Sequence, residues 1–438
     1  QNILHSLCSN CKGFHFCSHA HNVNVFHTFK RSNNMKKQTI LMCALGVAAI
    51  AATAIGTGYS VSSKKGGVFF AGGDDGVWKH YARKEATATD KGIREYWVNC
   101  LTNEHVFTAP TTGTIEEGGA YKTEGFAADD DRWIYPASLA AQDVVMTETT
   151  KALDLGTYAG GTVSYIKAGA FNLGTDPANL DVSGFKADHT DDGLKTVEIG
   201  TIKDGKEYAL TCETTFVTAM IKTVEDYSLY ILPDTANTDK FGYFKLTNNL
   251  GLNNKVSESF FDWSASFCGV FDGDGHTLDF KSGGSVGTFN NLDGATIKNV
   301  TINDCYYNNY GTTCLLAKNV NAVRLENVKT VIKTGKEELK GDVEAKIEDN
   351  KGYLAAGRFM GVTVKDCIFD ATGYSLASLF GRGGNFTEPT VVNSTVKASR
   401  LVEAMHSNYT KLTYQPENVE ITDPKTEKNI SGLTFVKA

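Results

Sequence analysis

The sequence predicts a mainly β protein whose C-terminal half is a solenoid, and two observations carry this prediction. The first is a short phrase, Ala295–Ile302, that returns four times further along the chain. The Asn or Asp of each copy stands at position 299, 327, 366, 393 or 418. The second is a composition of 43 Gly and 7 Pro with frequent Val, Ile and Thr alternation, which favours strands and turns. Such repeats are typical of stacked units that bury their apolar faces against their neighbours.

Within each copy, the alternation of apolar and polar residues predicts which side chains point inward. Val300 and Ile302 alternate with Thr301, so a strand here buries the first two and exposes the third. Cys367 occupies the place of Val300 in a later copy and is predicted to be a small buried residue. Lys298 is predicted to be exposed. The repeated Asn tolerates left-handed backbone angles, so we expect it at a sharp bend, where stacked amides form a structural ladder.

The stretch around the first copy resembles a known family. The segments Phe267–Phe280, Gly287–Phe289 and Gly294–Val300 are similar to the pattern of GLUG-type surface proteins of Gram-positive bacteria. Tyr243–Leu252 is similar to the usual lead-in of that pattern. The resemblance covers about residues 220–436. It implies a right-handed parallel β-helix in a cell-surface protein.

Two smaller β units are predicted ahead of the solenoid, which is assigned to residues 220–438. Residues 145–218 hold strand-length runs separated by Asp-Gly turns. This spacing suggests a small immunoglobulin-like β-sandwich that acts as a spacer. Residues 66–140 are assigned to a small N-terminal β module.

Part of the N-terminal module, residues 85–107, resembles a short cysteine-containing repeat of Gram-positive surface proteins. Ala88 and Asn103 stand where that repeat has two of its cysteines, so the role of those cysteines in the family does not carry over to this chain. Tyr96 and Trp97 are predicted to serve the core of the module, because a unit this small needs aromatic residues for its own packing.

The N-terminal region has the pattern of a secretory signal. Residues 35–54 begin with Met-Lys-Lys, continue through an apolar stretch and end on Ala52-Thr53-Ala54, the expected cleavage triplet. Residues 1–34 are interpreted as an upstream extension that is not native. Secretion is favoured over an uncleaved anchor, because the apolar stretch is rich in Ala, Gly and Thr and weak for the roughly 20 residues that a membrane span requires. We therefore expect a secreted or extracellular protein associated with the cell surface.

The charge of the chain argues against nucleic acid as a partner. The formal net charge is −7, and residues 1–54 hold five basic and no acidic side chains, so the remainder stands at −12. An acidic chain has no general attraction for phosphates. The expected partners are instead an extracellular polysaccharide or host glycan and the cell wall, with membrane contact only through an uncleaved signal segment.

Several motifs imitate metal sites, and the sequence predicts neither a metal nor a cofactor. A Cys-x2-Cys pair with nearby His in residues 1–34 has zinc-ligand spacing, but a folded zinc knuckle ahead of a signal peptide would obstruct export. Asp272 and Asp274 have the alternate carboxylates of a calcium loop without its downstream acidic partner. Calcium at these residues stays open, as does a disulfide between Cys268 and Cys305.

Parallel β-helices also carry polysaccharide lyases and glycoside hydrolases, so a catalytic alternative is kept. Those hydrolases resemble one another in an ordered set of Asn-Thr-Asp, Asp-Asp, Gly-His-Gly and Arg-x-Lys motifs. Asn237–Asp239 and Gly275–Thr277 match parts of this set, but no Asp-Asp lies between them and no Arg-x-Lys follows. Only Asp272 and Asp274 offer paired carboxylates close to His276.

The leading prediction is therefore a secreted or cell-surface structural or adhesive protein with no catalytic residues. Its candidate ligand-binding residues are Tyr306, Tyr307 and Tyr310, whose rings would stack on sugar faces. The alternative is that these rings cover an edge of the solenoid. An insertion at residues 333–352, rich in Lys, Glu and Asp, lengthens one repeat interval and is expected to form a solvated loop.

Overall fold

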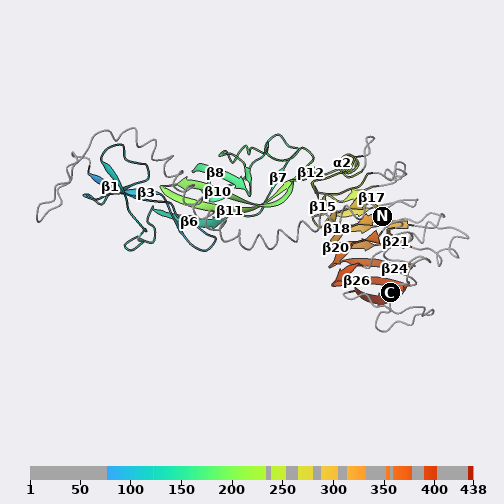
Figure 1. Cartoon of the computed structure of the whole chain (residues 1–438). Helices are drawn as coiled ribbons and strands as arrows, with labels where there is room; N and C mark the ends of the chain where they lie inside the picture. The colour runs from blue at the N-terminus through green and yellow to red at the C-terminus, as the bar shows by residue number, and fades with distance from the viewer. Residues whose placement is uncertain are drawn as a thin grey trace, which may run out of the picture. The chain divides into compact units, whose positions relative to one another are not determined.

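Strands dominate the part of the chain that the computed structural model describes (Figure 1). The described residues are 76–121, 123–232, 238–252, 265–279, 288–303, 313–331, 352–355, 359–376, 389–401 and 433–437. The predicted signal at 35–54 and the extension at 1–34 lie outside them. The chain divides into two compact units, Gln1–His80 with Trp97–Glu117, and Tyr81–Tyr96 with Gly118–Ala438. Within the described residues, no helix is both long and apolar enough to span a membrane.

The first unit is built on a four-stranded sheet in the order β4-β3-β1-β5. Its strands are β1 (Val77–Tyr81), β3 (Tyr96–Asn99), β4 (His105–Val106) and β5 (Thr114–Glu117). β1 and β5 pair in parallel, whereas β3 and β4 pair in antiparallel orientation. Trp97 is 9% exposed and stacks on His80 with ring centroids 5.0 Å apart, and Tyr96 is 2% exposed. The prediction that Tyr96 and Trp97 are core residues is confirmed.

Sheet B of the second unit has seven strands in the order β2-β6-β11-β10-β8-β9, and β7 also pairs with β11. The strands are β2 (Gly92–Ile93), β6 (Trp133–Ser138), β7 (Gln142–Val145), β8 (Thr162–Ala168), β9 (Phe171–Asn172), β10 (Gly193–Lys203) and β11 (Lys206–Val217). β10 and β11 form a long antiparallel hairpin. Its turn residues Asp204 and Gly205 have φ values of 50° and 75°, the positive angles for which Asp-Gly is suited.

The apolar face of sheet B is covered by connecting segments. Ile199 and Phe216 of the sheet share one buried core with Leu153, Leu173 and Leu180, which lie outside the strands. Those connections are rich in Gly, Asp and Thr, so they supply apolar side chains without the alternation that a strand needs. The arrangement differs from the expected pair of packed immunoglobulin-like sheets. It also includes β2 and β6, which the sequence assigned to the N-terminal module.

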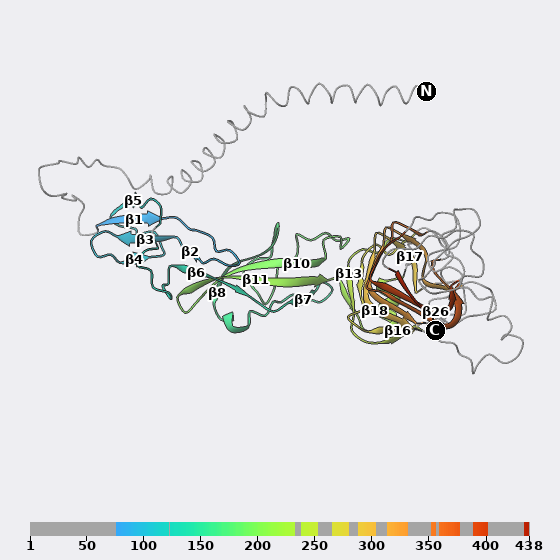
Figure 2. The same cartoon turned by 90° about the horizontal axis from the view of Figure 1, so that it is seen from below.

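From Ala219 onward, the described strands pair in parallel. Sheet C has twelve strands: β12 (Ala219–Ile221), β13 (Tyr243–Leu246), β14 (Leu250–Gly251), β15 (Val270–Asp272), β16 (Thr277–Asp279), β18 (Thr296–Asn303), β20 (Arg324–Val331), β23 (Thr363–Lys365), β24 (Ile368–Leu376), β25 (Thr390–Val392), β26 (Ser394–Leu401) and β27 (Leu433–Lys437). Sheet D has four: β17 (Phe289–Asp293), β19 (Thr313–Asn321), β21 (Gly352–Ala355) and β22 (Phe359–Met360). Figure 2 shows these strands layered one behind another. Such parallel pairing is compatible with a β-helix.

Residues one repeat apart stand beside one another in this part of the chain. Ile297 pairs with Leu325, and Leu325 pairs with Val364, and all three are completely buried. Val300 and Cys367 are each 1% exposed, so the prediction that both belong to the core is confirmed. Burial raises the pKa of the Cys367 thiol to about 11, so it stays protonated and behaves as an apolar side chain.

The short helix α2 (Val224–Tyr230) covers the start of this core. Thr223 begins the helix with a reciprocal capping box, and the helix packs on β12, the first strand of sheet C. Tyr227 is fully buried near Phe271, and its hydroxyl donates to the carbonyl oxygen of Thr288 at 2.6 Å. Helix α2 therefore covers the side of the first repeat on which no other repeat packs.

Candidate functional site

The repeated Asn and Asp residues stand at equivalent bends, and side-chain hydrogen bonds link them in two separate groups. Asn299, Asn327, Asp366 and Asn393 have φ values of 52°, 53°, 54° and 45°. Nδ2 of Asn299 donates to Asp272, and Nδ2 of Asn327 donates to Oδ1 of Asn299, both at 3.0 Å. Further along, Nδ2 of Asn393 donates to Oδ1 of Asp366 at 2.7 Å. The predicted bend is confirmed at all four positions, and the predicted amide contacts are confirmed for the pairs 299–327 and 366–393. Position 418 lies outside the described residues.

Three further amide contacts join neighbouring strands and were not predicted. Nδ2 of Asn319 donates to Asn291, Nδ2 of Asn321 donates to Asp293, and Nδ2 of Asn303 donates to Asp279, at 2.8, 2.7 and 3.2 Å. The partners are separated by 28, 28 and 24 residues along the chain. Asn or Asp recurring at the interval of the main repeat is the sequence signal that would have found them.

We expect the conformation and the amide of Asn327 to contribute separately to stability. Asn327→Leu keeps a positive φ, which costs leucine roughly 1 kcal/mol because it lacks the short polar side chain that lets asparagine adopt this region. It also loses the hydrogen bond to Asn299. Because Asn327 is exposed, the total loss should be about 1–2 kcal/mol in urea unfolding. Asn327→Gly is the control, since it relieves the backbone and loses only the amide. A leucine variant as stable as the parent would contradict the ladder.

The same reasoning predicts a stabilising substitution at the neighbouring bend. Ala322 has a φ of 51°, whereas the residues at the same bend in other repeats are Gly294 and Gly361, with φ values of 67° and 61°. Ala322→Gly should raise the free energy of unfolding by about 0.5–1 kcal/mol, because glycine adopts this region without strain. Ala295→Gly is the matched control and should lower it, since Ala295 is completely buried. A destabilising Ala322→Gly would contradict the prediction.

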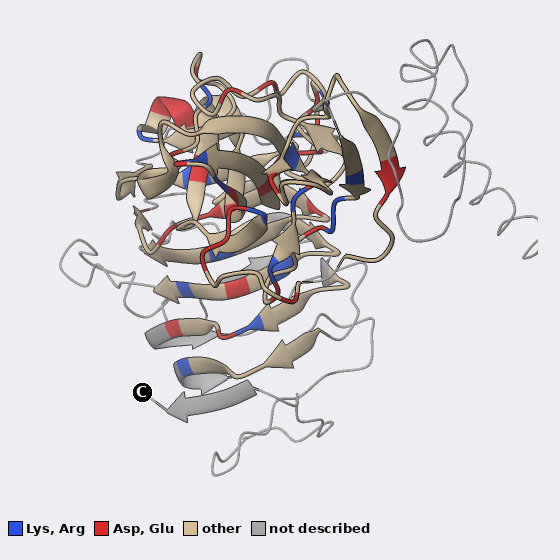
Figure 3. Ribbon diagram, turned by 90° about the vertical axis from the view of Figure 1, so that its left-hand side faces the viewer, with Lys and Arg blue, Asp and Glu red and all other residues tan. Residues whose placement is uncertain are grey.

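A column of alternating charge runs across the outer face of sheet C. In register order, its members are Lys245, Asp272, Lys298, Glu326 and Lys365. Neighbouring strands lie roughly 4.8 Å apart, so each of the three inner members faces an opposite charge on both sides. Figure 3 shows basic and acidic positions side by side on successive strands. The column was not predicted, because its members differ in residue type and no single letter repeats.

The acidic turn after β15 is the best-defined polar site in this part of the chain. Asp272 is 7% exposed and ends β15, and Gly273 to His276 turn the chain into β16. A Cβ on Gly273 would lie 2.5 Å from Val300, so only glycine fits this close approach. Asp274 has a φ of 49°, and its backbone N–H donates to Oδ1 of Asp272 at 3.1 Å.

The carboxylate of Asp272 is surrounded by donors. Oδ2 accepts the hydroxyl of Tyr243 at 2.6 Å and lies 3.2 Å from Nζ of Lys298, and Oδ1 accepts the amide of Asn299. Burial opposes ionisation of Asp272, but the hydrogen bonds from Tyr243, Asn299 and Asp274 outweigh it and hold the pKa below its usual value. Burial and the bond to Asp272 raise the pKa of Tyr243. Asp272 is therefore an ionised, internally satisfied carboxylate.

This geometry gives Asp272 a structural role in the turn and does not favour it as a general acid. A general acid in glycoside cleavage needs a raised pKa, and the pKa of Asp272 is lowered. Lys298 also lies over the ring of Tyr243 at 5.1 Å, so it is not the exposed residue that the sequence predicted. Its alkyl chain and charge are part of the site.

The second carboxylate of the turn is paired with a lysine. Nζ of Lys245 lies 3.4 Å from Oδ2 of Asp274 and 2.8 Å from Oδ2 of Asp143 on β7. Burial lowers the pKa of Lys245, but the bond to Asp143 and the nearby carboxylates outweigh it and raise the pKa overall. The ammonium groups of Lys245 and Lys298 thus stand beside the carboxylates of Asp274 and Asp272, where a calcium ion would need oxygen ligands. The residues present therefore do not fit calcium.

Several residues singled out from sequence lie outside the described part of the chain. These are the candidate sugar-stacking residues Tyr306, Tyr307 and Tyr310, as well as Cys305, Asn237 and most of the insertion at 333–352. Cys268 forms no disulfide with another described cysteine, and burial raises the pKa of its thiol to about 12. The tyrosines remain predictions.

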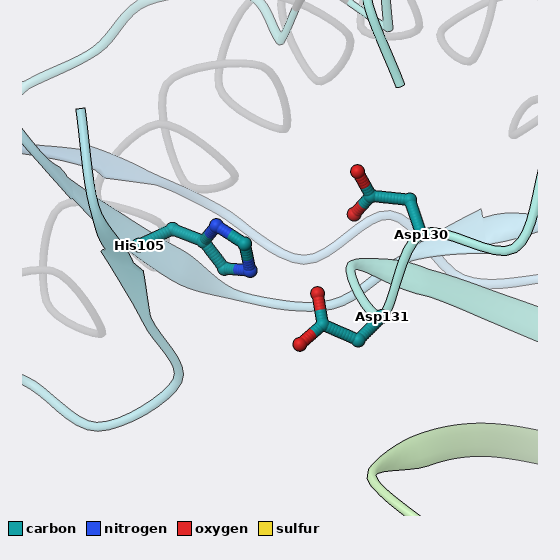
Figure 4. A group of neighbouring side chains, drawn as sticks. All are labelled: His105, Asp130 and Asp131. Atoms are coloured by element: carbon teal, nitrogen blue, oxygen red, sulfur yellow. The ribbon is translucent and has the colours of Figure 1, made fainter. Parts of the chain in front are cut away.

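His105, Asp130 and Asp131 are of the residue types that bind metals (Figure 4). His105 belongs to the first unit and the two aspartates to the second, so no site is assigned to them. Within the second unit, both oxygens of Asp130 are held by the guanidinium of Arg132, at 2.8 and 2.6 Å. This fork geometry gives Asp130 a structural partner.

Comparison with known proteins adds no assignment, because no protein-family model, curated protein or solved structure matches the chain.

Proposed function

We propose that this chain is a secreted or cell-surface structural or adhesive protein, non-catalytic, that binds an extracellular polysaccharide or host glycan. In this proposal, residues 220–438 form a right-handed parallel β-helix of the GLUG type that serves as the binding scaffold. The modules before it act as spacers, and the protein associates with the cell wall. Neither a metal nor a cofactor takes part.

One observation carries the proposal: the polar side chains of the acidic turn are bonded to neighbouring strands. Asp272 is the most buried acid of the turn, and its oxygens are bonded to Tyr243, Asn299 and Lys298. A carboxylate tied in this way orders the stack, which supports a structural over a catalytic role for the turn. The outer face keeps closely spaced charges and threonines, which suit extended polar ligands.

The test is a glycan array with the full chain, followed by turnover assays on pectins, alginates and host glycans. We expect binding without release of reducing ends or unsaturated products. Changing Tyr306, Tyr307 and Tyr310 together to Ala should weaken binding at least about tenfold, by loss of ring stacking on sugar. Tyr158→Ala, in the connection that packs on sheet B, is the matched control. Turnover that disappears in Asp272→Asn or Asp274→Asn would move the protein to the lyase or hydrolase class.

The location is tested separately by N-terminal sequencing. Protein released by a Gram-positive host should begin close after Ala54, because the expected cleavage triplet is Ala52-Thr53-Ala54. Released protein that still begins near Gln1 would contradict both the signal and the interpretation of residues 1–34.

A further inference from the structure

The passage from sheet B to sheet C is made by a single run of extended chain. β11 ends at Val217 and β12 begins at Ala219, so only Thr218 separates the two strands. On the sheet B side, the carbonyl oxygens of Val217 and Thr218 accept the N–H groups of Met146 and Thr147 at 2.7 and 3.2 Å. Strand pairing therefore continues to the last residue of the passage.

The sheet C side begins at the same residue. The N–H of Thr218 donates to the carbonyl oxygen of Tyr243 at 2.7 Å, and the N–H of Tyr243 donates to Oγ1 of Thr218 at 2.9 Å. A Cβ on Gly242 would lie 2.3 Å from Oγ1 of Thr218, so the two chains touch without room for a side chain. Thr218 is thus bonded to both sheets.

Side-chain contacts on either side of Thr218 also stabilise the passage between the two sheets. Oγ1 of Thr218 donates to Oδ2 of Asp192 at 2.6 Å, and the side chain of Asp192 is completely buried. His189 reaches the same Oδ2 through Nδ1 at 3.1 Å, while Oδ1 of Asp192 has no hydrogen-bond partner among the described residues. On the other flank, Lys245 of β13 bridges to Asp143 of β7.

We infer that Thr218, Asp192, Tyr243 and Lys245 form a rigid joint that fixes sheet B and sheet C as one mechanical element. A flexible linker would have solvated backbone groups, whereas the backbone groups at Thr218 are paired on both sides. Tension applied along the chain at this point is shared by the backbone bonds of Thr218 and by the Lys245 pair. The joint does not depend on whether the protein binds a glycan.

The test is hydrogen exchange followed by mass spectrometry on the full chain. In the parent protein, peptides covering 212–221 and 240–247 should exchange as slowly as the β10–β11 hairpin. Thr218→Val keeps the shape of the side chain but removes its two hydrogen bonds, to Asp192 and to the N–H of Tyr243. It should speed exchange in those two peptides by about tenfold or more and leave β18 and β20 unchanged.

Thr196→Val is the matched control. Oγ1 of Thr196 donates to a carboxylate oxygen of Glu213 at 2.7 Å within sheet B, so its loss should leave the joint peptides unchanged. Should Thr218→Val not fold, Lys245→Met is measured in its place, with faster exchange expected in the same peptides. Parent peptides that exchange as fast as exposed loops would overturn the inference. So would joint peptides that do not respond to the variant.

Discussion

Replacing Val300 with aspartate is expected to unfold the stacked strands around it. Val300 is 1% exposed, pairs with Val328 on the next strand, and contacts the core that runs through β15, β18 and β20. The substitution removes a buried apolar side chain and places a charge where no partner exists among the described core residues. The free energy of unfolding should fall by about 4–5 kcal/mol, the range of severe core substitutions.

The measurement is urea unfolding of the full chain, with hydrogen exchange of residues 288–331 to locate the damage. Thr301→Asp is the matched control, because Thr301 is the next residue, points outward and pairs with Lys329. It should cost less than about 1 kcal/mol, as surface changes usually do. Equal losses for the two variants would show that the inward and outward assignment of this strand is wrong.

Replacing Glu207 with alanine is expected to have the second large effect. Glu207 is 7% exposed and receives two guanidinium groups, from Arg83 at 2.5 Å and from Arg94 at 3.2 Å. Arg94 is itself 7% exposed, and burial lowers its pKa despite the charge of Glu207. Removing the carboxylate takes away the buried negative charge that both guanidinium groups share, and breaking a buried ion pair typically costs about 3–5 kcal/mol.

Glu198→Ala is the matched control on the neighbouring strand. Glu198 pairs with Lys167 at 2.8 Å, but both side chains are about half exposed, so its loss should cost less than about 1 kcal/mol. Glu207→Gln should lie between, since it keeps hydrogen-bond acceptance without the charge. Thermal unfolding ranks the three variants. If Glu207→Ala were no worse than Glu198→Ala, the buried pair would not be holding residues 81–96 to sheet B.

The stacked part of the fold was predictable because its information is local and repeated. A residue type that returns at a steady interval, such as the inward apolar residue or Asn299 and Asn327, reveals both the strand and the register. The charge column could not be found in this way, because Lys298 and Glu326 share a position but have opposite chemistry. Only the register of the folded chain shows that the two face each other.

Sheet B was predicted less well, for a different physical reason. Its strands pair across long stretches of chain, as when Ile134 of β6 stands beside both Gly92 and Glu207. Nothing near Ile134 in the sequence marks these partners, and the pattern of short runs and Asp-Gly turns is equally compatible with two packed sheets. The joint at Thr218 was hidden in the same way, because Phe216 to Ala219 form one buried run with no turn residue to mark the change of sheet.

In sheet C, the pairing of the strands does not depend on how many residues connect them. Ile297 and Leu325 pair although 28 positions separate their numbers, and Leu325 and Val364 pair although 39 do. The extra residues are accommodated between β20 and β23 without a shift in either ladder. A gene encoding such a protein can therefore gain or lose segments between strands, or duplicate whole repeats, while every retained side chain keeps its neighbours. The reach of the molecule and the variety of its loops are thus free to change over generations without a new core.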